Sequence, residues 1–262
     1  MVRMGALHIR RLNLAGDAEA IESLVAEAAP DAIIHTAALS RPDLCAANPE
    51  LARSLNVYAT RGLARAAARA GAHFVFTSSD LVYGAHTAEP FEDSTQPAPV
   101  GVYAATKVAA EQAALRETGG QATIARMALL YGWGTGASQC FAEEWLARLR
   151  AGQLVRAFTD QFRRALSVED AAAMLLAMAE RRLAGIYNVA GPELPSRYEF
   201  ALLLARTFGC DEALVEPTRQ ASVTYADPRP TRLDLSAAKL AAALGYEPAT
   251  PAMGLGRMAD FA

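Results

Sequence analysis

The stretch His73-Phe-Val-Phe-Thr-Ser-Ser-Asp-Leu-Val-Tyr-Gly84 begins as an apolar run and then presents three hydroxyl residues and a carboxylate: Thr77, Ser78, Ser79 and Asp80. An unbroken apolar run is typical of a strand that is buried on both faces of a parallel sheet. Open α/β sheets bind their ligands at the carboxyl ends of such strands. We therefore expect the four polar side chains at a ligand-binding edge. The alternative is ordinary turn and helix-cap chemistry.

Strand-like and helix-like segments alternate along the rest of the chain. Strands are predicted at 33–36, 74–77 and 123–130, and helices at 18–28, 49–70, 102–115, 142–151 and 168–181. Such alternation predicts an α/β fold with a mostly parallel sheet and helices on both of its faces. The polar segment 85–99 contains three prolines and predicts a long loop, which in an enzyme would border the substrate pocket.

One pair of residues indicates proton-transfer chemistry. Only two of the 25 basic residues are lysines, and one of them, Lys107, lies four residues after Tyr103. The alanine-rich segment 102–115 contains no helix breaker, so the two side chains should share one face of a helix. A free phenol has a pKa of about 10, and a nearby cation lowers it towards the range useful for acid–base catalysis. The alternative is a surface helix with a solvated lysine.

Two segments together resemble a known family: Thr77-Ser-Ser-Asp-Leu-Val-Tyr-Gly84 and Val102-Tyr-Ala-Ala-Thr-Lys107. They are similar to the active-site pair of the extended short-chain dehydrogenases/reductases, and more narrowly to the dTDP-4-dehydrorhamnose reductases. Softer patterns follow in the right order: Ile33-Ile-His-Thr-Ala-Ala38 with Asp43 after it, Asn56-Val-Tyr-Ala-Thr-Arg-Gly-Leu-Ala-Arg-Ala-Ala67, Ala125-Arg-Met-Ala-Leu-Leu-Tyr-Gly132, Asp160-Gln161 and Ile186-Tyr-Asn-Val-Ala-Gly191. The resemblance implies a Rossmann-like core at residues 1–132, incomplete at its N-terminus. In residues 133–262 it implies a small C-terminal substrate lobe interleaved with the last sheet strands.

The resemblance also implies a chemistry. Such a protein uses NADP or NAD to reduce a keto group on a nucleotide-activated sugar; a nucleotide-sugar epimerase is an alternative. Tyr103 would donate the proton, and Lys107 would hold the nicotinamide ribose and lower the pKa of Tyr103. Ser79 would steady the carbonyl oxygen, and Asp80 would lie beside the sugar. The cofactor would also contact Ala37, Ala38, Asn56, Thr77 and Met127, and the substrate would also contact Leu129, Arg163 and Arg229.

Four arginines in the second half of the chain could hold the diphosphate of such a substrate: Arg163, Arg164, Arg229 and Arg232. The planar guanidinium suits two-point binding of phosphate. Because surface arginines are common in this chain, we expect only one of the four to contact phosphate.

Two positions depart from the family. Dehydratases of this group usually carry a Glu directly after the Asp, and here that position is Leu81. Dehydration is therefore disfavoured. The rhamnose reductases have an aromatic residue where this chain has Leu129, so the particular sugar stays open.

The N-terminal segment departs most from the pattern of the family. The Gly-x-x-Gly-x-x-Gly turn that holds a dinucleotide pyrophosphate does not occur in the sequence, whose first glycines are Gly5 and Gly16. The segment 6–14 predicts an edge strand. In it, Asn13 stands where the family that the chain resembles often has an Asp near the adenine. The first βαβ unit, of about 30 residues or more, is what the pattern lacks. Two interpretations follow. The chain is a shortened reductase that starts at an internal Met1 or Met4, or it works as it stands, as a binding or regulatory protein with weak or no dinucleotide binding.

Two further groups of glycines predict loops. Gly132, Gly134 and Gly136 follow a predicted strand, but their spacing is wrong for a dinucleotide turn, and we expect a substrate loop there. Gly254-Leu-Gly256 follows no strand and also predicts a loop.

Composition argues against several function classes. A chain of 262 residues that is 52% hydrophobic and 20% charged predicts a globular fold with a large core. A net charge of −3 and a pI near 5.9 argue against nucleic acid as a partner. No apolar run reaches the length of about 18 residues that a membrane-spanning helix needs, so no membrane partner is expected.

Cysteines and histidines carry little further signal. Cys45, Cys140 and Cys210 are widely spaced, which suits reduced thiols in the cytoplasm. The start of the chain lacks the apolar region of a signal peptide. The histidines have no metal-binding spacing, so we expect no metal site. By resemblance, the protein is expected to form a homodimer.

Overall fold

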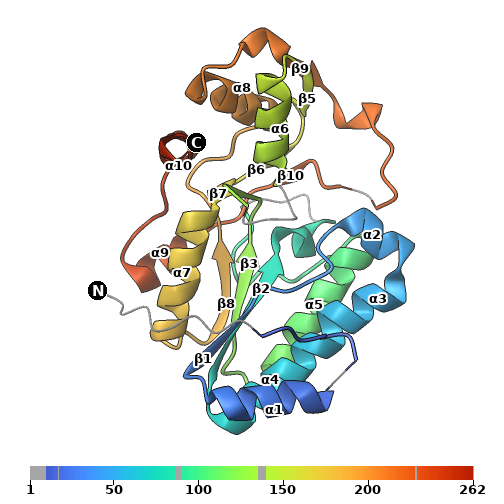
Figure 1. The fold of residues 1–262 in the computed structure, drawn as a ribbon, viewed down its shortest axis with the longest axis vertical. Coiled ribbons are helices and arrows are strands. Elements are labelled where there is room, and N and C mark those ends of the chain that lie inside the picture. The colour runs from blue at the N-terminus through green and yellow to red at the C-terminus, as the bar shows by residue number, and fades with distance from the viewer. Residues whose placement is uncertain (1–9, 17, 86–89, 135–139, 228, 262) are drawn as a thin grey trace.

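A four-stranded parallel sheet forms the centre of the molecule, in the order β1-β2-β3-β8 (Figure 1). The computed structural model describes residues 10–16, 18–85, 90–134, 140–227 and 229–261. The strands are β1 (Ala32–His35), β2 (His73–Ser79), β3 (Thr123–Met127) and β8 (Gly185–Val189). In this register, Phe76 of β2 lies beside His35 of β1 and Ile124 of β3. Parallel pairing brings the carboxyl ends of the strands to one edge of the sheet.

Helices cover both faces of this sheet. One face is covered by α1 (Ala18–Ala28), α4 (Ala59–Ala70) and α5 (Gly101–Glu117), and the other by α7 (Val168–Glu180) and α9 (Ala238–Leu244). Side chains alternate along β2, so that Phe74 and Phe76 pack against the first group and Val75 against the second. The predicted α/β fold with helices on both faces is therefore confirmed.

The predicted helix at 49–70 is continuous but not uniform. α2 (Pro42–Ala47) and α3 (Pro49–Arg53) lead into a π-helical turn at Ser54–Tyr58, which continues as α4. Such a widened turn often marks a functional region. Here it carries the buried Asn56.

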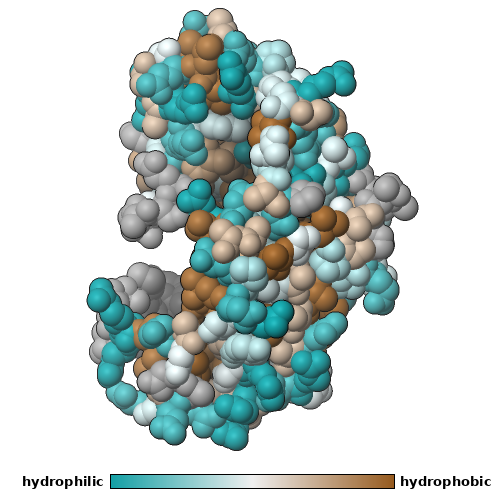
Figure 2. Space-filling model, turned by 90° about the vertical axis from the view of Figure 1, so that its right-hand side faces the viewer, coloured by the Kyte–Doolittle hydropathy of each residue, from teal (hydrophilic) through white to brown (hydrophobic). Residues whose placement is uncertain are grey.

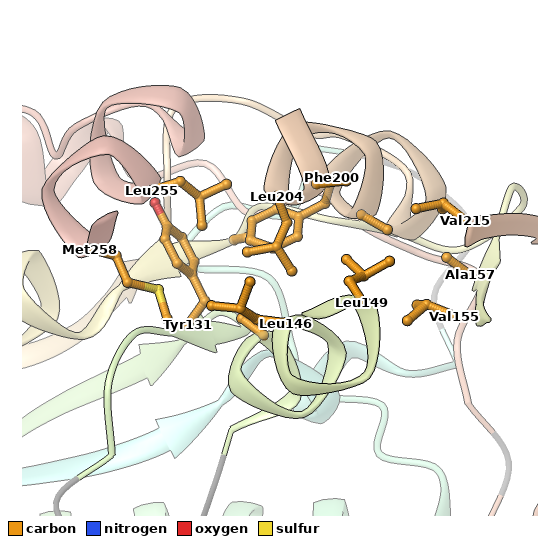
Figure 3. Packing of buried hydrophobic residues seen from close by; sticks show 14 residues of the cluster. Tyr131, Leu146, Leu149, Val155, Ala157, Phe200, Leu204, Val215, Leu255 and Met258 are labelled. Atoms are coloured by element: carbon orange, nitrogen blue, oxygen red, sulfur yellow. The ribbon is translucent and has the colours of Figure 1, made fainter. Parts of the chain in front are cut away.

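A smaller lobe lies beyond the carboxyl edge of the sheet. We define it as α6 (Phe141–Arg150), β5 (Val155–Phe158), α8 (Arg197–Thr207), β9 (Val215–Thr218) and α10 (Pro251–Asp260). β5 and β9 pair in parallel. Figure 3 shows its core, in which Leu146 and Leu149 of α6 face Phe200 and Leu204 of α8. Because β8 and α9 return to the sheet from within this half of the chain, sheet and lobe are interleaved in sequence.

Short elements connect the sheet to the lobe. β4 (Leu130–Tyr131) pairs with β7 (Leu166–Ser167), and β6 (Phe162–Arg163) pairs with β10 (Arg232–Leu233). The 3-10 turns lie at Asp80–Tyr83, Glu212–Leu214 and Gln220–Ser222. The strand predicted at 123–130 thus ends at Met127, and its last residue belongs to β4.

The loop predicted at Gly254-Leu-Gly256 is wrong, because both glycines lie inside α10. The helix starts at Pro251 after Thr250, whose side chain accepts a hydrogen bond from the Met253 N–H. A Cβ on Gly254 would overlap the Tyr131 hydroxyl. Close packing between the helix and Tyr131 therefore requires a glycine at this position.

The N-terminal edge strand is not formed by the described part of segment 6–14. Residues 10–13 are irregular and 14–16 form a turn, while residues 6–9 lie outside the described residues. Of the predicted substrate loop, Gly132 lies in a bend and Gly134 outside any helix or strand, and Gly136 lies outside the described residues. In the part of the chain that the structure describes, no helix is both long and apolar enough to cross a membrane.

Candidate active site

A cleft of about 980 Å³ lies between the carboxyl edge of the sheet and the lobe. Figure 2 shows the molecule hollowed between its sheet-bearing part below and the lobe above. The cleft is lined by the loop after β1, the end of β2, one face of α5, the segment after β3, the starts of α6 and α7, and Arg229. The predicted site residues among its lining are Ala38, Thr77, Ser79, Asp80, Tyr103, Lys107, Met127, Leu129 and Arg229.

Tyr103 and Lys107 lie one turn apart on α5, as the spacing predicts, and both are buried. The Lys107 ammonium lies 4.2 Å from the centroid of the Phe76 ring. Burial lowers the pKa of Lys107 to about 8, and the charges of Glu111 and Cys45 oppose this shift. At neutral pH the side chain is therefore still mostly protonated.

The expectation that Lys107 lowers the pKa of Tyr103 is not met. Burial raises the pKa of Tyr103 above its ordinary value, and the charges of Asp80 and Cys45 add to this rise. A hydrogen bond with Ser79 opposes it. Desolvation of the phenolate outweighs the other effects, so Tyr103 keeps its proton near neutral pH.

Ser79 and Asp80 line the cleft, and Ser79 also caps the turn that follows β2. The Ser79 hydroxyl accepts a hydrogen bond from the Leu81 N–H at 3.2 Å and donates one to Asp80 Oδ1 at 3.2 Å. It thereby caps the 3-10 turn while it also lines the cleft. Burial raises the pKa of Asp80, and the charge of Arg163 opposes this shift.

A buried charged network lies beneath these residues, and sequence reasoning did not find it. Arg126 of β3 donates two hydrogen bonds to Glu111 of α5, at 3.0 Å and 2.8 Å. Ser78 donates to the same carboxylate, and Arg126 donates to the Tyr83 hydroxyl at 2.7 Å. Burial lowers the pKa of Arg126, but the hydrogen bonds to Glu111 and the charge of that carboxylate raise it, and the pKa lies above its ordinary value. The available signals were an arginine inside an apolar strand and a glutamate one turn after Lys107.

The residues expected to bind the cofactor divide into two groups. Ala38, Thr77 and Met127 line the cleft, and the Thr77 hydroxyl donates to the His35 carbonyl at 3.1 Å. Ala37 is exposed and is not among the lining residues.

Asn56 is buried behind the wall of the cleft. Its side chain accepts from the Leu39 N–H at 2.8 Å and donates to the Leu39 carbonyl at 3.2 Å and to Thr106 Oγ1 at 3.0 Å. It therefore ties the loop after β1 to α5 and does not face the cleft.

The four arginines considered as phosphate ligands differ in their contacts and in whether they line the cleft. Arg229 lines the cleft and donates to Asp43 Oδ2 at 2.9 Å. Arg163 does not line it; its guanidinium donates to the backbone carbonyls of Phe162, Pro230 and Thr231 and so joins β6 to the segment before β10.

Arg164 and Arg232 share Asp234 as an acceptor. Neither of them is among the residues that line the cleft.

The loop 85–99 does not border the cleft through its described residues. Instead, Phe91 is buried and bridges to Leu235, and Asp93 accepts a hydrogen bond from the Asn188 N–H. The loop therefore packs against the end of β8 and the segment after β10.

The cleft fits the ribose–nicotinamide end of a dinucleotide. Lys107 presents a buried ammonium to it, and the nearest carboxylate on α5, Glu111, is already engaged by Arg126 and Ser78. Among the described residues the Lys107 ammonium donates no hydrogen bond, so it could donate to the hydroxyls of a bound ligand. For the pyrophosphate, the sequence offers no glycine-rich turn. Within the described ranges, no three His, Cys, Asp or Glu side chains are grouped to bind a metal ion.

Comparisons with known proteins show which proteins this chain is similar to. Residues 2–261 match the family model of the RmlD substrate binding domain. The chain is 33% identical over 230 residues to methionine adenosyltransferase 2 subunit beta of Xenopus tropicalis, covering 86% of this chain and 68% of that protein. It is 32% identical over 219 residues to the dTDP-4-dehydrorhamnose reductase of Mycobacterium tuberculosis, covering 81% and 71%.

A solved structure shows the same fold. The dTDP-4-dehydrorhamnose reductase of Bacillus anthracis, in complex with NADP, superposes with a TM-score of 0.87 at 24% identity, covering 96% of this chain and 87% of that one. The chain therefore belongs to the RmlD substrate binding domain family, among the extended short-chain reductase-like proteins close to dTDP-4-dehydrorhamnose reductase.

Proposed function

We propose that the protein reduces a keto group on a nucleotide-activated sugar with NADP or NAD as the hydride source. The observation that carries this proposal is the meeting of Ser79, Tyr103 and Lys107 at the carboxyl end of β2, inside one cleft between sheet and lobe. Relatives that carry the name dTDP-4-dehydrorhamnose reductase support the substrate class.

The side chains divide the work as follows. The Ser79 hydroxyl, which donates to Asp80 without substrate, would turn to donate its hydrogen bond to the carbonyl oxygen. The Tyr103 hydroxyl gives its proton to that oxygen as negative charge develops on it. The bound cofactor supplies the hydride to the carbonyl carbon, so that hydride and proton together yield the alcohol. Tyr103 is protonated near neutral pH, as a proton donor must be.

The residues around Ser79 and Tyr103 provide charges and contacts for the cofactor and the substrate. Lys107 binds the ribose hydroxyls and keeps a positive charge near the developing oxyanion. Asp80 contacts the sugar, and Arg229 at the lobe side contacts the diphosphate. Leu81, in place of an acid, leaves no second proton donor next to Asp80 for the removal of water.

A second function is a regulatory subunit without catalysis. One observation favours it: the identity to methionine adenosyltransferase 2 subunit beta. In that case the Tyr103 site is a relict.

Titration of the protein with NADPH and NADH tests the proposal. Micromolar binding, followed by loss of nicotinamide fluorescence upon addition of a dTDP-4-keto-6-deoxy sugar, supports the reductase. No binding up to millimolar cofactor contradicts it and favours the regulatory function.

A further inference from the structure

The connection between β9 and β10 crosses from the lobe to the sheet-bearing part of the molecule. After the 3-10 turn at Gln220–Ser222, it runs down the right-hand side of Figure 1 to the level of α2. We call its described residues 223–227 and 229–231 the strap. The strap is mostly exposed or half-buried, but it contains a buried carboxylate, Asp227. A carboxylate that is taken out of water needs a favourable partner in the fold.

The partner of Asp227 is the start of α5. A Cβ on Gly101, the first residue of this helix, would overlap the Asp227 carboxylate. Gly101 also has a φ of +83°. Both the close approach and the backbone conformation therefore require glycine here. Tyr103 follows two residues later, in the first turn of the same helix.

The residues of α5, all of which the structure describes, provide no anion for its N-terminus. Its N-cap residue Val100 makes no side-chain cap hydrogen bond, and its first turn contains no acidic residue. By contrast, α7 and α8 are capped by the hydroxyls of Ser167 and Ser196. The first N–H groups of a helix lack intrahelical partners and carry partial positive charge. A carboxylate is therefore favourable at this end, and Asp227 supplies it from a distant part of the chain.

The strap is also held on the far side of Asp227. Arg229 lines the cleft and donates to Asp43 Oδ2 of α2 at 2.9 Å. The Pro230 carbonyl accepts a hydrogen bond from Arg163. The strap, α2 and the first turn of α5 thus meet at Asp227.

A cysteine of α2 lies at the same junction. Cys45 is completely buried, and it packs in one cluster with Tyr103 and Val102 of α5. Burial raises the pKa of its thiol, and the charge of Asp227 adds to this rise. A reagent can reach the thiol only when this junction opens. The labelling rate of Cys45 therefore reports whether α2, the start of α5 and the strap stay together.

We propose that Asp227 is a positioning residue, whose carboxylate holds the first turn of α5, and with it Tyr103, against the strap that carries Arg229. Asp227 is not among the residues that line the cleft, so it acts through the helix and not on a ligand. The inference rests on the proposed function for its effect on turnover, but not for the position of α5.

The test compares the full chain with the variants Asp227→Asn and Asp211→Asn. Asparagine keeps the size of the side chain and removes its charge. The control residue, Asp211, caps the 3-10 turn Glu212–Leu214 between α8 and β9. The rate at which N-ethylmaleimide labels Cys45 is measured by peptide mass mapping, with the half-buried Cys210 as the internal reference.

We expect Cys45 to react about fivefold faster in Asp227→Asn, which is the size of effect that a charge at a helix N-terminus produces. Cys210 should react at the wild-type rate, and Asp211→Asn should leave the rate of Cys45 unchanged. If Asp227→Asn does not fold, Asp227→Ser, which also removes the charge, is measured in its place with the same expectation.

Two results would overturn the inference. One is a wild-type labelling rate of Cys45 in the Asp227 variant. The other is an equal acceleration of Cys45 and Cys210, which would show a general loss of stability without a local role at α5.

Steady-state kinetics with a keto-sugar nucleotide add a readout that a merely structural residue would not give. In Asp227→Asn, kcat should fall about tenfold or more, because the proton donor is less well placed, while the affinity for NADPH stays unchanged. The pH profile should also stay unchanged, since Asp227 is not among the charges that shift the pKa of Tyr103. A shifted pH profile would contradict a role in positioning alone.

The two sets of measurements separate this inference from the proposed function. A wild type that binds no NADPH but whose Cys45 labelling depends on Asp227 would refute the reductase and leave the positioning role. A wild type that turns over substrate, with Cys45 labelling independent of Asp227, would refute the positioning role and leave the reductase.

Discussion

The carboxylate of Glu111 in α5 accepts two hydrogen bonds from Arg126 in β3, one from Nε at 3.0 Å and one from an Nη nitrogen at 2.8 Å. Ser78 donates to the same carboxylate, so the strand end that carries Ser79 is fastened to the helix that carries Tyr103. Both partners of the pair are almost completely buried. The pair therefore sets the relative position of the two elements that form the site.

Replacement of Arg126 should strongly destabilise the folded protein. Arg126→Met leaves the Glu111 carboxylate buried without its cation, and we expect a loss of about 3–5 kcal/mol in the free energy of unfolding. Denaturant titration measures it. The control is Arg156→Met, which breaks an exposed pair with Glu216 and should cost less than about 1 kcal/mol. Equal losses in the two variants would contradict the structural role of the buried pair.

Tyr103→Phe separates catalysis from stability. The change removes one hydroxyl and should lower turnover about 10²–10⁴-fold, because it deletes the proton donor. The free energy of unfolding should fall by less than about 1.5 kcal/mol, and NADPH affinity should persist. Steady-state kinetics with a keto-sugar nucleotide and cofactor titration measure both. Turnover at the wild-type rate would exclude the mechanism.

Lys107 should make stability depend on pH in the alkaline range. Its pKa is lowered from 10.5 to about 8 in the folded state, so between these values the unfolded chain binds more protons and stability rises with pH. Below pH 8 the burial of the charge destabilises the fold by its full amount, about 3 kcal/mol at most from the size of the shift.

The variant Lys107→Met tests this dependence. It should be more stable than the wild type at neutral pH, and the difference should shrink as the pH rises from 8 towards 10.5, as measured by denaturant unfolding at several pH values. Lys239→Met, at the exposed second lysine, is the matched control. A pH-independent difference for Lys107→Met would show that its ammonium is not desolvated.

Gly254→Ala should destabilise the lobe through a single contact. The new Cβ would overlap the Tyr131 hydroxyl, and overpacking of this kind costs about 1–3 kcal/mol. Tyr131→Phe removes that hydroxyl, which is buried without a hydrogen-bond partner in the described structure, and should restore part of the loss in the double variant.

Gly256→Ala is the control on the same helix. An added Cβ there meets nothing within 4 Å, so the change should stabilise α10 by about 0.5–1 kcal/mol. Thermal unfolding of the four variants measures the cycle. Additive effects of Gly254→Ala and Tyr131→Phe would contradict the predicted overlap.

Local pattern was enough to predict the two elements that carry the candidate site. The apolar run before Ser79 and the unbroken segment around Tyr103 and Lys107 predicted β2 and α5, because periodicity and the lack of breakers are properties of neighbouring residues. The prediction of a loop at Gly254 was wrong, because this glycine allows close packing against Tyr131, which is far away in the sequence. Local pattern also failed for the pKa of Tyr103, because the degree of burial depends on what the rest of the chain packs over the phenol.

The sequence by itself predicted the α/β class, the strand that ends at Ser79 and the helix that places Tyr103 and Lys107 on one face, because strand patterning and helical spacing follow from residues close in the chain. Only the tertiary structure decided which groups each arginine contacts. Arg163 finds its acceptors at Pro230 and Thr231, and Arg197 finds aromatic rings at Phe141 and Trp145. These partners are far away in sequence, and hydrogen bonding and desolvation depend on distance in space, which no local pattern encodes.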